Sequence, residues 1–155
     1  MPAGCDIRQG DFRTVLSDIV DGTVDLIFTD PPYGKEYLEV WEELSRMAAR
    51  ILRPGALLIT YTGQHHLPTV MASLGTHLSY VWLGTILTHG AKYIDRQRHI
   101  YAKCKPLLFY SRGAYEPIDY VDDFIADDKP EKDAHDWQQG IVAALYYIAH
   151  LVPLG

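Results

Sequence analysis

The chain has 155 residues, 48% of them apolar, and a formal net charge of −6 at pH 7. This length supplies one hydrophobic core and is short for two, so we expect a single domain over residues 1–155. No apolar run approaches the roughly 20 residues of a membrane-spanning helix, and the acidic balance argues against non-specific coating of nucleic acid. The two cysteines form no CxxC pair, which predicts neither a disulfide framework nor a zinc knuckle. The composition favours a cytoplasmic protein with no membrane partner.

The first part of the chain has the pattern helix, strand, helix. A short helix is expected over Phe12 to Ile19, and Val24 to Thr29 is a β-branched and aromatic run of buried-strand length. From Tyr37 to Leu52, apolar side chains recur every three or four residues, which predicts an amphipathic helix. Arg53-Pro54-Gly55 is expected to end that helix.

Further strand and helix patterns follow. Ala56 to Tyr61 is a second apolar strand, and Leu67 to Leu74 is a helix. Leu78 to Thr88 and Pro106 to Ser111 predict two more strands, which we expect to form an antiparallel pair around a basic segment. Apolar strands separated by helices indicate an α/β fold, with a mostly parallel sheet covered by helices on both faces.

The end of the chain divides into an acidic stretch and an apolar one. Residues 114–134 are rich in aspartate and contain Pro130, so we expect an acidic loop there. This stretch lacks the glycine and the final glutamate of a calcium-binding loop. From His135 to Pro153 the pattern becomes helical again.

A rare tetrapeptide, Asp30-Pro31-Pro32-Tyr33, follows the first predicted strand directly. Chance would produce it in roughly one chain of this length in a thousand, with proline at about 5% of residues. Its position at the carboxyl end of a buried strand is where open α/β sheets place their ligand sites. The alternative is that two prolines simply end the strand in a turn.

This motif resembles that of the S-adenosylmethionine-dependent DNA amino-methyltransferases, which carry Asp-Pro-Pro-Tyr or a close variant at the end of a central strand. The resemblance implies a Rossmann-like methyltransferase fold, S-adenosylmethionine as cofactor and DNA as partner. Asp30 and the Pro31 carbonyl would accept the two hydrogens of the target amine, and Pro31 and Pro32 would fix the loop. Tyr33 would stack on a base turned out of the duplex. The aspartate favours adenine N6, since the cytosine-N4 branch more often has serine there; cytosine N4 stays open as the alternative.

Two other segments resemble cofactor contacts of the family. Gly10-Asp11 looks like the acidic position that contacts the cofactor adenosine, although it also suits a plain turn. Residues 135–139 resemble the segment that, in permuted members, holds the methionine end of the cofactor; a helix start at Asp136 is the alternative. The cofactor-binding candidates are therefore Asp11, Asp30, His135, Gln138 and Gln139.

In the permuted order, a glycine-rich cofactor loop should come next, and the sequence contains no such loop. The resemblance therefore implies a partial methyltransferase domain that lacks strands of its sheet. A second copy or a complementary segment would cover the exposed edge. A non-catalytic DNA- or nucleotide-binding module is the competing hypothesis. The family would place such a protein in restriction-modification or phage self-protection.

Basic residues cluster in residues 89–105, which we expect to be a DNA-contacting insertion. Cations interleaved with two tyrosines suit phosphate contact and base stacking, whereas the alternative is a solvated hairpin or helix face. The candidate DNA-binding residues are Lys92, Arg96, Arg98 and Lys103. His65-His66 is the densest group of histidines, but no carboxylate lies at ligand spacing, so no metal site is expected.

Overall fold

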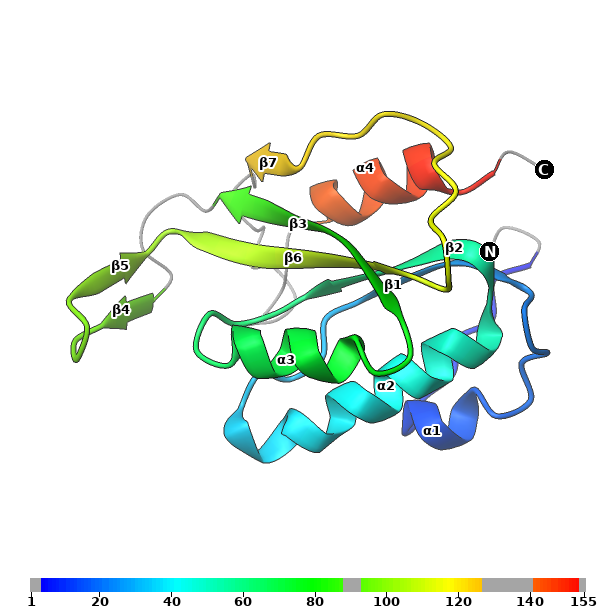
Figure 1. The fold of residues 1–155 in the computed structure, drawn as a ribbon, viewed down its shortest axis with the longest axis horizontal. Helices are drawn as coiled ribbons and strands as arrows, with labels where there is room; N and C mark the ends of the chain where they lie inside the picture. The colour runs from blue at the N-terminus through cyan, green and yellow to red at the C-terminus, as the bar shows by residue number, and fades with distance from the viewer. Residues whose placement is uncertain (1–3, 88–92, 127–140, 154–155) are drawn as a thin grey trace.

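The computed structural model describes residues 4–87, 93–126 and 141–153. The chain forms a sheet with helices on two sides and a small separate hairpin (Figure 1). In chain order the elements are α1 (Phe12–Val15), β1 (Val24–Thr29), the 3-10 helix η1 (Lys35–Tyr37), α2 (Leu38–Ile51), β2 (Leu52–Tyr61), α3 (Leu67–Leu74), β3 (Ser79–Leu87), β4 (Tyr93–Asp95), β5 (Ile100–Ala102), β6 (Cys104–Ser111), β7 (Phe124–Ala126) and α4 (Val142–Leu151).

The main sheet has five strands in the order β1-β2-β6-β3-β7. The β1 and β2 strands are parallel, β6 is antiparallel to both of its neighbours, and β3 and β7 are parallel. All strands except β6 therefore run in one direction, which confirms the predicted mostly parallel α/β sheet. The pairing of β3 with β6 also confirms the expected antiparallel pair. Among the described residues, no strand pairs with the outer edge of β1.

Helices cover both faces of this sheet because β2 and β6 are apolar on both sides. On one face, Leu58 and Leu108 pack with Trp41 of α2 and Val70 of α3. The opposite face carries Ile59, Tyr61, Leu107 and Phe109, which pack against Ala143, Tyr147 and Leu151 of α4. Full burial of side chains of this size stabilises the fold by about 1.5–3 kcal/mol each. The expected two-sided cover is confirmed.

The junction of α2 and β2 differs from the prediction. We expected Arg53-Pro54-Gly55 to separate helix from strand, but α2 ends at Ile51 and β2 begins at Leu52. The strand continues through Pro54 because the neighbouring Gly55 N–H donates to the Arg112 carbonyl at 2.8 Å. Gly55 has a φ of +78°, and the register with β1 shifts at this point, as in a bulge.

Two further predictions need correction. The first helix was expected to reach Ile19, but it ends at Val15 and the next residues form tight turns, with Ile19 N–H donating to the Leu16 carbonyl. Residues 114–134 were expected to be a loop throughout, yet β7 lies within them. It pairs with the edge of β3, where the Thr85 N–H donates to the Asp123 carbonyl at 2.7 Å.

The final helix is seen as α4, while residues 135–140 of its predicted range lie outside the described residues. Within the described ranges, no helix combines the length and the apolar character that crossing a membrane would require.

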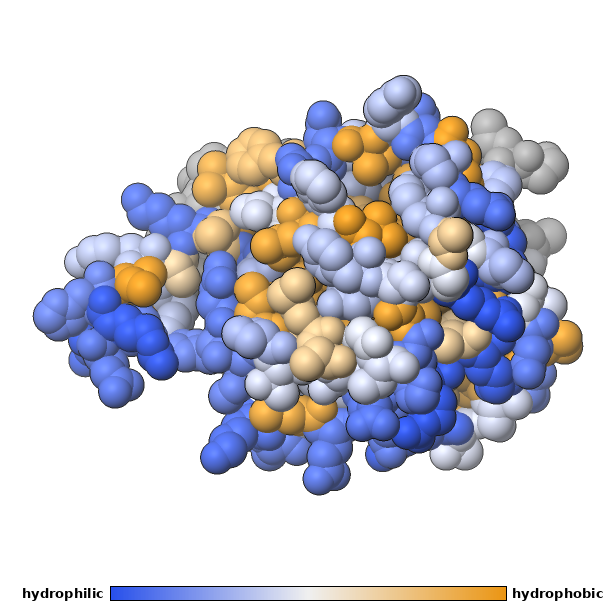
Figure 2. Space-filling model, in the orientation of Figure 1, coloured by the Kyte–Doolittle hydropathy of each residue, from blue (hydrophilic) through white to orange (hydrophobic). Residues whose placement is uncertain are grey.

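The β4–β5 hairpin projects from one end of the sheet (Figure 1). It extends from the same end at which β3 finishes and β6 begins, because it connects these two strands. Its surface is mainly hydrophilic in Figure 2, with a small apolar spot.

Candidate functional site

Three strands bring their ends together at one edge of the sheet. Thr29 of β1 pairs with Thr60 of β2, so the chain leaves both parallel strands at the same edge. Because β6 is antiparallel, it begins at this edge, with Leu107 opposite Tyr61. The loop Asp30–Tyr33, the end of β2 and the start of β6 are therefore neighbours, as expected for a ligand site of an open α/β sheet.

The Asp30 carboxylate is the centre of this neighbourhood. The Lys105 ammonium lies 3.2 Å from Oδ1 and 3.1 Å from Oδ2, and the Tyr33 hydroxyl donates to Oδ1. The Lys105 side chain is only 13% exposed and that of Asp30 29% exposed. The pair is thus only partly shielded from water, and removal of either partner would leave the other charge without its counter-ion.

Aromatic rings enclose the ammonium. Lys105 Nζ lies 4.1 Å from the ring centre of Tyr61 and 5.0 Å from that of Tyr33, which gives cation–π attraction. Behind Tyr61, the Phe28 ring packs edge-on at 5.4 Å and also stacks on Tyr147 of α4. The site therefore rests on an aromatic layer that joins β1, β2 and α4.

Burial raises the pKa of Tyr33 far above its usual value, and the adjacent Asp30 carboxylate raises it further. Tyr33 consequently keeps its proton at physiological pH and remains a hydrogen-bond donor. The segment after β2 packs closely on this ring, since a Cβ added to Gly63 would lie 3.3 Å from the Tyr33 Cβ. The structure thus places Asp30 and Tyr33 in contact, while their expected roles toward a target base stay predictions.

Asp11 has a local structural role. Its carboxylate caps α1 by accepting from the Arg13 N–H at 2.9 Å, and it also pairs with the Arg13 guanidinium. The hydrogen bonds from the Arg13 side chain and backbone lower the pKa of Asp11 to about 2. The expected cofactor contact of Asp11 stays a prediction, and His135, Gln138 and Gln139 lie outside the described residues.

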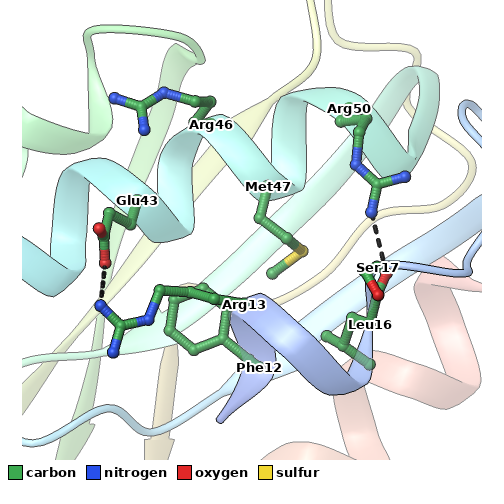
Figure 3. Close-up of a pocket in the computed structure, with 8 residues that line it drawn as sticks. All are labelled: Phe12, Arg13, Leu16, Ser17, Glu43, Arg46, Met47 and Arg50. Carbon is green, nitrogen blue, oxygen red and sulfur yellow. Dashed lines mark hydrogen bonds and ion pairs between the residues drawn. The ribbon is translucent and has the colours of Figure 1, made fainter.

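A hollow of about 470 Å³ lies between α1 and α2 (Figure 3). Its arginines are engaged: Arg13 bonds Glu43 at 2.8 Å, and Arg50 donates to the Leu16 carbonyl at 2.9 Å. None of the four motif residues lines it. These contacts hold α1 against α2.

The hairpin contains two of the predicted DNA-binding residues in its turn. Arg98 donates to Asp95 through both its backbone N–H and its guanidinium, each at 2.8 Å, and these bonds lower the pKa of Asp95. Arg96 is exposed, as is Lys103 at the base of the hairpin, while Lys92 lies outside the described residues.

The hairpin is also tied to the candidate site. His65, in the segment after β2, lies 3.7 Å from the Asp95 carboxylate and packs edge-on against Tyr93 at 5.4 Å between ring centres. In the described part of the chain, no three histidine, cysteine, aspartate or glutamate side chains come together as a metal site.

The sequence placed Lys105 at the end of the basic segment 89–105, just before the strand predicted from Pro106, and its contact with Asp30 was not predicted. The signal was a single lysine at the start of an otherwise apolar strand, two residues before fully buried Leu107. A lysine in that place needs a partner for its charge.

No family model matches the chain. Its structure is similar to PvuII DNA methyltransferase, which is cytosine-N4-specific, with a TM-score of 0.74 and 12% identity over 93% of this chain and 69% of that one. The M1.HpyAVI–SAM complex is similar over 84% of this chain and 68% of that one, with a TM-score of 0.64 and 15% identity. The chain has the fold of these Rossmann-like methyltransferases.

A curated relative has a higher sequence identity to this chain, over a shorter stretch. The 4-amino-L-phenylalanine/4-methylamino-L-phenylalanine methyltransferase of Streptomyces pristinaespiralis is 33% identical to this chain over 44% of its length. The aligned stretch spans 31% of the relative's own length.

Proposed function

We propose that this chain carries the amine-binding part of a DNA methyltransferase that uses S-adenosylmethionine and modifies adenine at N6. The observation that carries the proposal is the Asp30 carboxylate at the carboxyl end of β1, which binds the Tyr33 hydroxyl and pairs with Lys105, itself over the ring of Tyr61. An exocyclic amine is a weak nucleophile because its lone pair is delocalised into the base. A site that methylates it must therefore draw the nitrogen out of conjugation.

The residues of the loop suit this task. Asp30 accepts one amine hydrogen and the Pro31 carbonyl accepts the other, which favours a pyramidal nitrogen with its lone pair exposed. Pro31 and Pro32 fix the backbone, so both acceptors are in place before the target arrives. Tyr33 offers a face for stacking the base, and the Asp30 carboxylate is placed to take the proton that the nitrogen releases.

The donor set also fits a sulfonium cofactor. The Asp30 carboxylate and the rings of Tyr33 and Tyr61 attract a positive charge, as their contacts with the Lys105 ammonium illustrate, and a sulfonium is also positively charged. Bound S-adenosylmethionine supplies an electrophilic methyl group. From the resemblance, the residues that would hold it are Asp11, Asp30, His135, Gln138 and Gln139.

The β4–β5 hairpin is the proposed contact with the DNA backbone. It extends from the edge of the sheet where Asp30 lies, and Tyr93 and Tyr101 are exposed on it. Guanidinium and ammonium groups on the same segment as these rings suit phosphate contact with some base stacking. The proposed cations are Lys92, Arg96, Arg98 and Lys103.

Cytosine N4 is the second candidate, because one of the similar structures is cytosine-N4-specific. The test is to incubate the purified protein with labelled S-adenosylmethionine and mixed-sequence DNA, digest the DNA, and identify the methylated nucleoside by mass spectrometry. N6-methyladenine supports the proposal, and N4-methylcytosine supports the second candidate. Binding of DNA and cofactor without any transfer would indicate a non-catalytic module instead.

Asp30→Asn is the decisive variant for this assay. It keeps the size of the side chain but removes the charge, and we expect at least a 100-fold loss of transfer, about 2.7 kcal/mol of transition-state stabilisation. Asp25→Asn is the matched control, since Asp25 lies on β1, which leads into the motif, and pairs with Arg53 at 2.8 Å. Equal activity of the two variants would contradict the role of Asp30.

A further inference from the structure

The chain supplies its own cation to the Asp30 carboxylate. Lys105 contacts both oxygens of that group, at 3.2 and 3.1 Å, and Tyr33 donates to one of them. In the proposed function, these oxygens must accept a hydrogen of the target amine. The ammonium and the amine therefore compete for the same acceptor.

Charge repulsion also opposes the presence of Lys105 beside the reacting amine. As the methyl group bonds to the nitrogen, the amine gains positive charge, and a second cation on the same carboxylate would repel it. Part of the stabilisation of the ammonium does not depend on Asp30, because Nζ also lies 4.1 Å from the ring centre of Tyr61. Its flexible stem allows the ammonium to leave the carboxylate while it stays over this ring.

We propose that Lys105 is a displaceable counter-ion of Asp30. It balances the charge of the part-buried carboxylate in the free protein, and it leaves when the neutral amine of the target base binds. This inference rests on the proposed function, because it concerns the same acceptor. Lys105 is thus a positioning residue that sets how readily the target amine gains access to Asp30.

The test compares Lys105→Met and Lys105→Arg by their KM and kcat for DNA in the methyl-transfer assay. Methionine removes the competitor, so we expect KM to fall about threefold or more, with kcat within about twofold of the unmodified protein. Arginine binds a carboxylate through two parallel hydrogen bonds, so we expect KM to rise by a similar factor. Lys35→Met is the matched control, because Lys35 is exposed at the start of η1, next to the motif.

The direction of the change in KM distinguishes a displaceable counter-ion from a cation that simply binds DNA or supports the fold. Loss of a cation normally weakens DNA binding, so a fall in KM for Lys105→Met but not for Lys35→Met supports displacement. A drop in kcat with unchanged KM, or a rise in KM for both Lys105 variants, overturns it. If the unmodified protein transfers no methyl group and 2′-deoxyadenosine produces no heat in calorimetric titration, the proposed function itself fails.

Discussion

The loop Asp30–Tyr33 and the β4–β5 hairpin share one edge of the molecule, but their side chains are held in different ways. Asp30 is bound by a lysine 75 residues away in sequence and by the half-buried Tyr33. The hairpin has two three-residue strands, its turn is closed by the local contact between Arg98 and Asp95, and its tyrosines are exposed.

This difference separates two tasks of the proposed enzyme. Chemistry needs groups whose positions are fixed by the packed core, as Asp30 and Tyr33 are. Contact with a charged polymer needs exposed cations that tolerate small shifts, as Arg96 offers. Substitutions in the first region should therefore alter stability or the rate of transfer, whereas those in the second should alter affinity and its dependence on salt.

The largest effect is expected at Tyr147, which supports the loop from behind. Its ring packs on Phe28 and Phe109, and its hydroxyl donates to the Asp122 carbonyl at 2.8 Å. Tyr147→Ala should lower the free energy of unfolding by about 3–5 kcal/mol, measured by urea denaturation. Leu145→Ala is the control, because that side chain on the same helix is 58% exposed and should cost far less. Equal losses of unfolding free energy in the two variants would mean that the aromatic layer does not stabilise the fold behind the loop.

A smaller effect is expected from the hydroxyl of Tyr33. Tyr33→Phe removes its hydrogen bond to the Asp30 carboxylate, and a bond to a charged group contributes about 1.5–3 kcal/mol. We expect the rate of methyl transfer to fall at least about tenfold. Tyr101→Phe makes the same chemical change on the exposed hairpin and should leave the rate unchanged. A similar loss in both variants would remove the distinction between the two regions.

Substitutions in the hairpin should change the affinity for DNA rather than the rate of methyl transfer. Arg96→Gln should weaken DNA binding several-fold and reduce the slope of log affinity against log salt by about one, since one phosphate contact is lost. Fluorescence anisotropy at several salt concentrations measures both quantities. Arg46→Gln on α2 removes the same charge away from the hairpin and should leave the slope unaltered.

The smallest expected effect is on the stability contributed by Asp11, which depends on pH. Because the bonds from Arg13 lower the pKa of Asp11 to about 2 in the folded protein, its ionised form contributes stability above its usual pKa. That contribution disappears as the pH falls towards 2. The stability difference between the unmodified protein and Asp11→Asn, measured by thermal unfolding, should thus be present at pH 6 and shrink below pH 4. A difference that is constant over this range would contradict the assigned cause.

The sequence predicts those features that depend on neighbouring residues. The β1 strand and α3 have the predicted bounds because apolar periodicity and flanking breakers are local signals. Pro54-Gly55 misled the prediction of β2, since the same residues end a helix or form a bulge within a strand. The β7 strand has only three residues and depends on the edge of β3, so no local pattern distinguishes it from a loop.

The candidate site likewise has a part that the local sequence predicts and a part that depends on distant strands. Asp30 and Tyr33 belong to one short motif, and the structure joins them by a hydrogen bond. Lys105 was missed as a partner because its contact with Asp30 depends on the position of β6 between β2 and β3. No spacing along the chain encodes that arrangement, which arises only from the pairing of distant strands.

The place of β6 in the sheet also bears on how the protein folds. During synthesis β2 and β3 emerge first, yet they are not neighbours in the final sheet, because β6 must enter between them. A nascent chain that stops before Cys104 exposes two strand edges to other chains, which favours aggregation. The pairing of β6 with β2 and β3 covers both edges through non-local contacts, and it also places Lys105 next to Asp30. The pairing of β6 thus joins the two parallel halves of the sheet and assembles the Asp30–Lys105 pair.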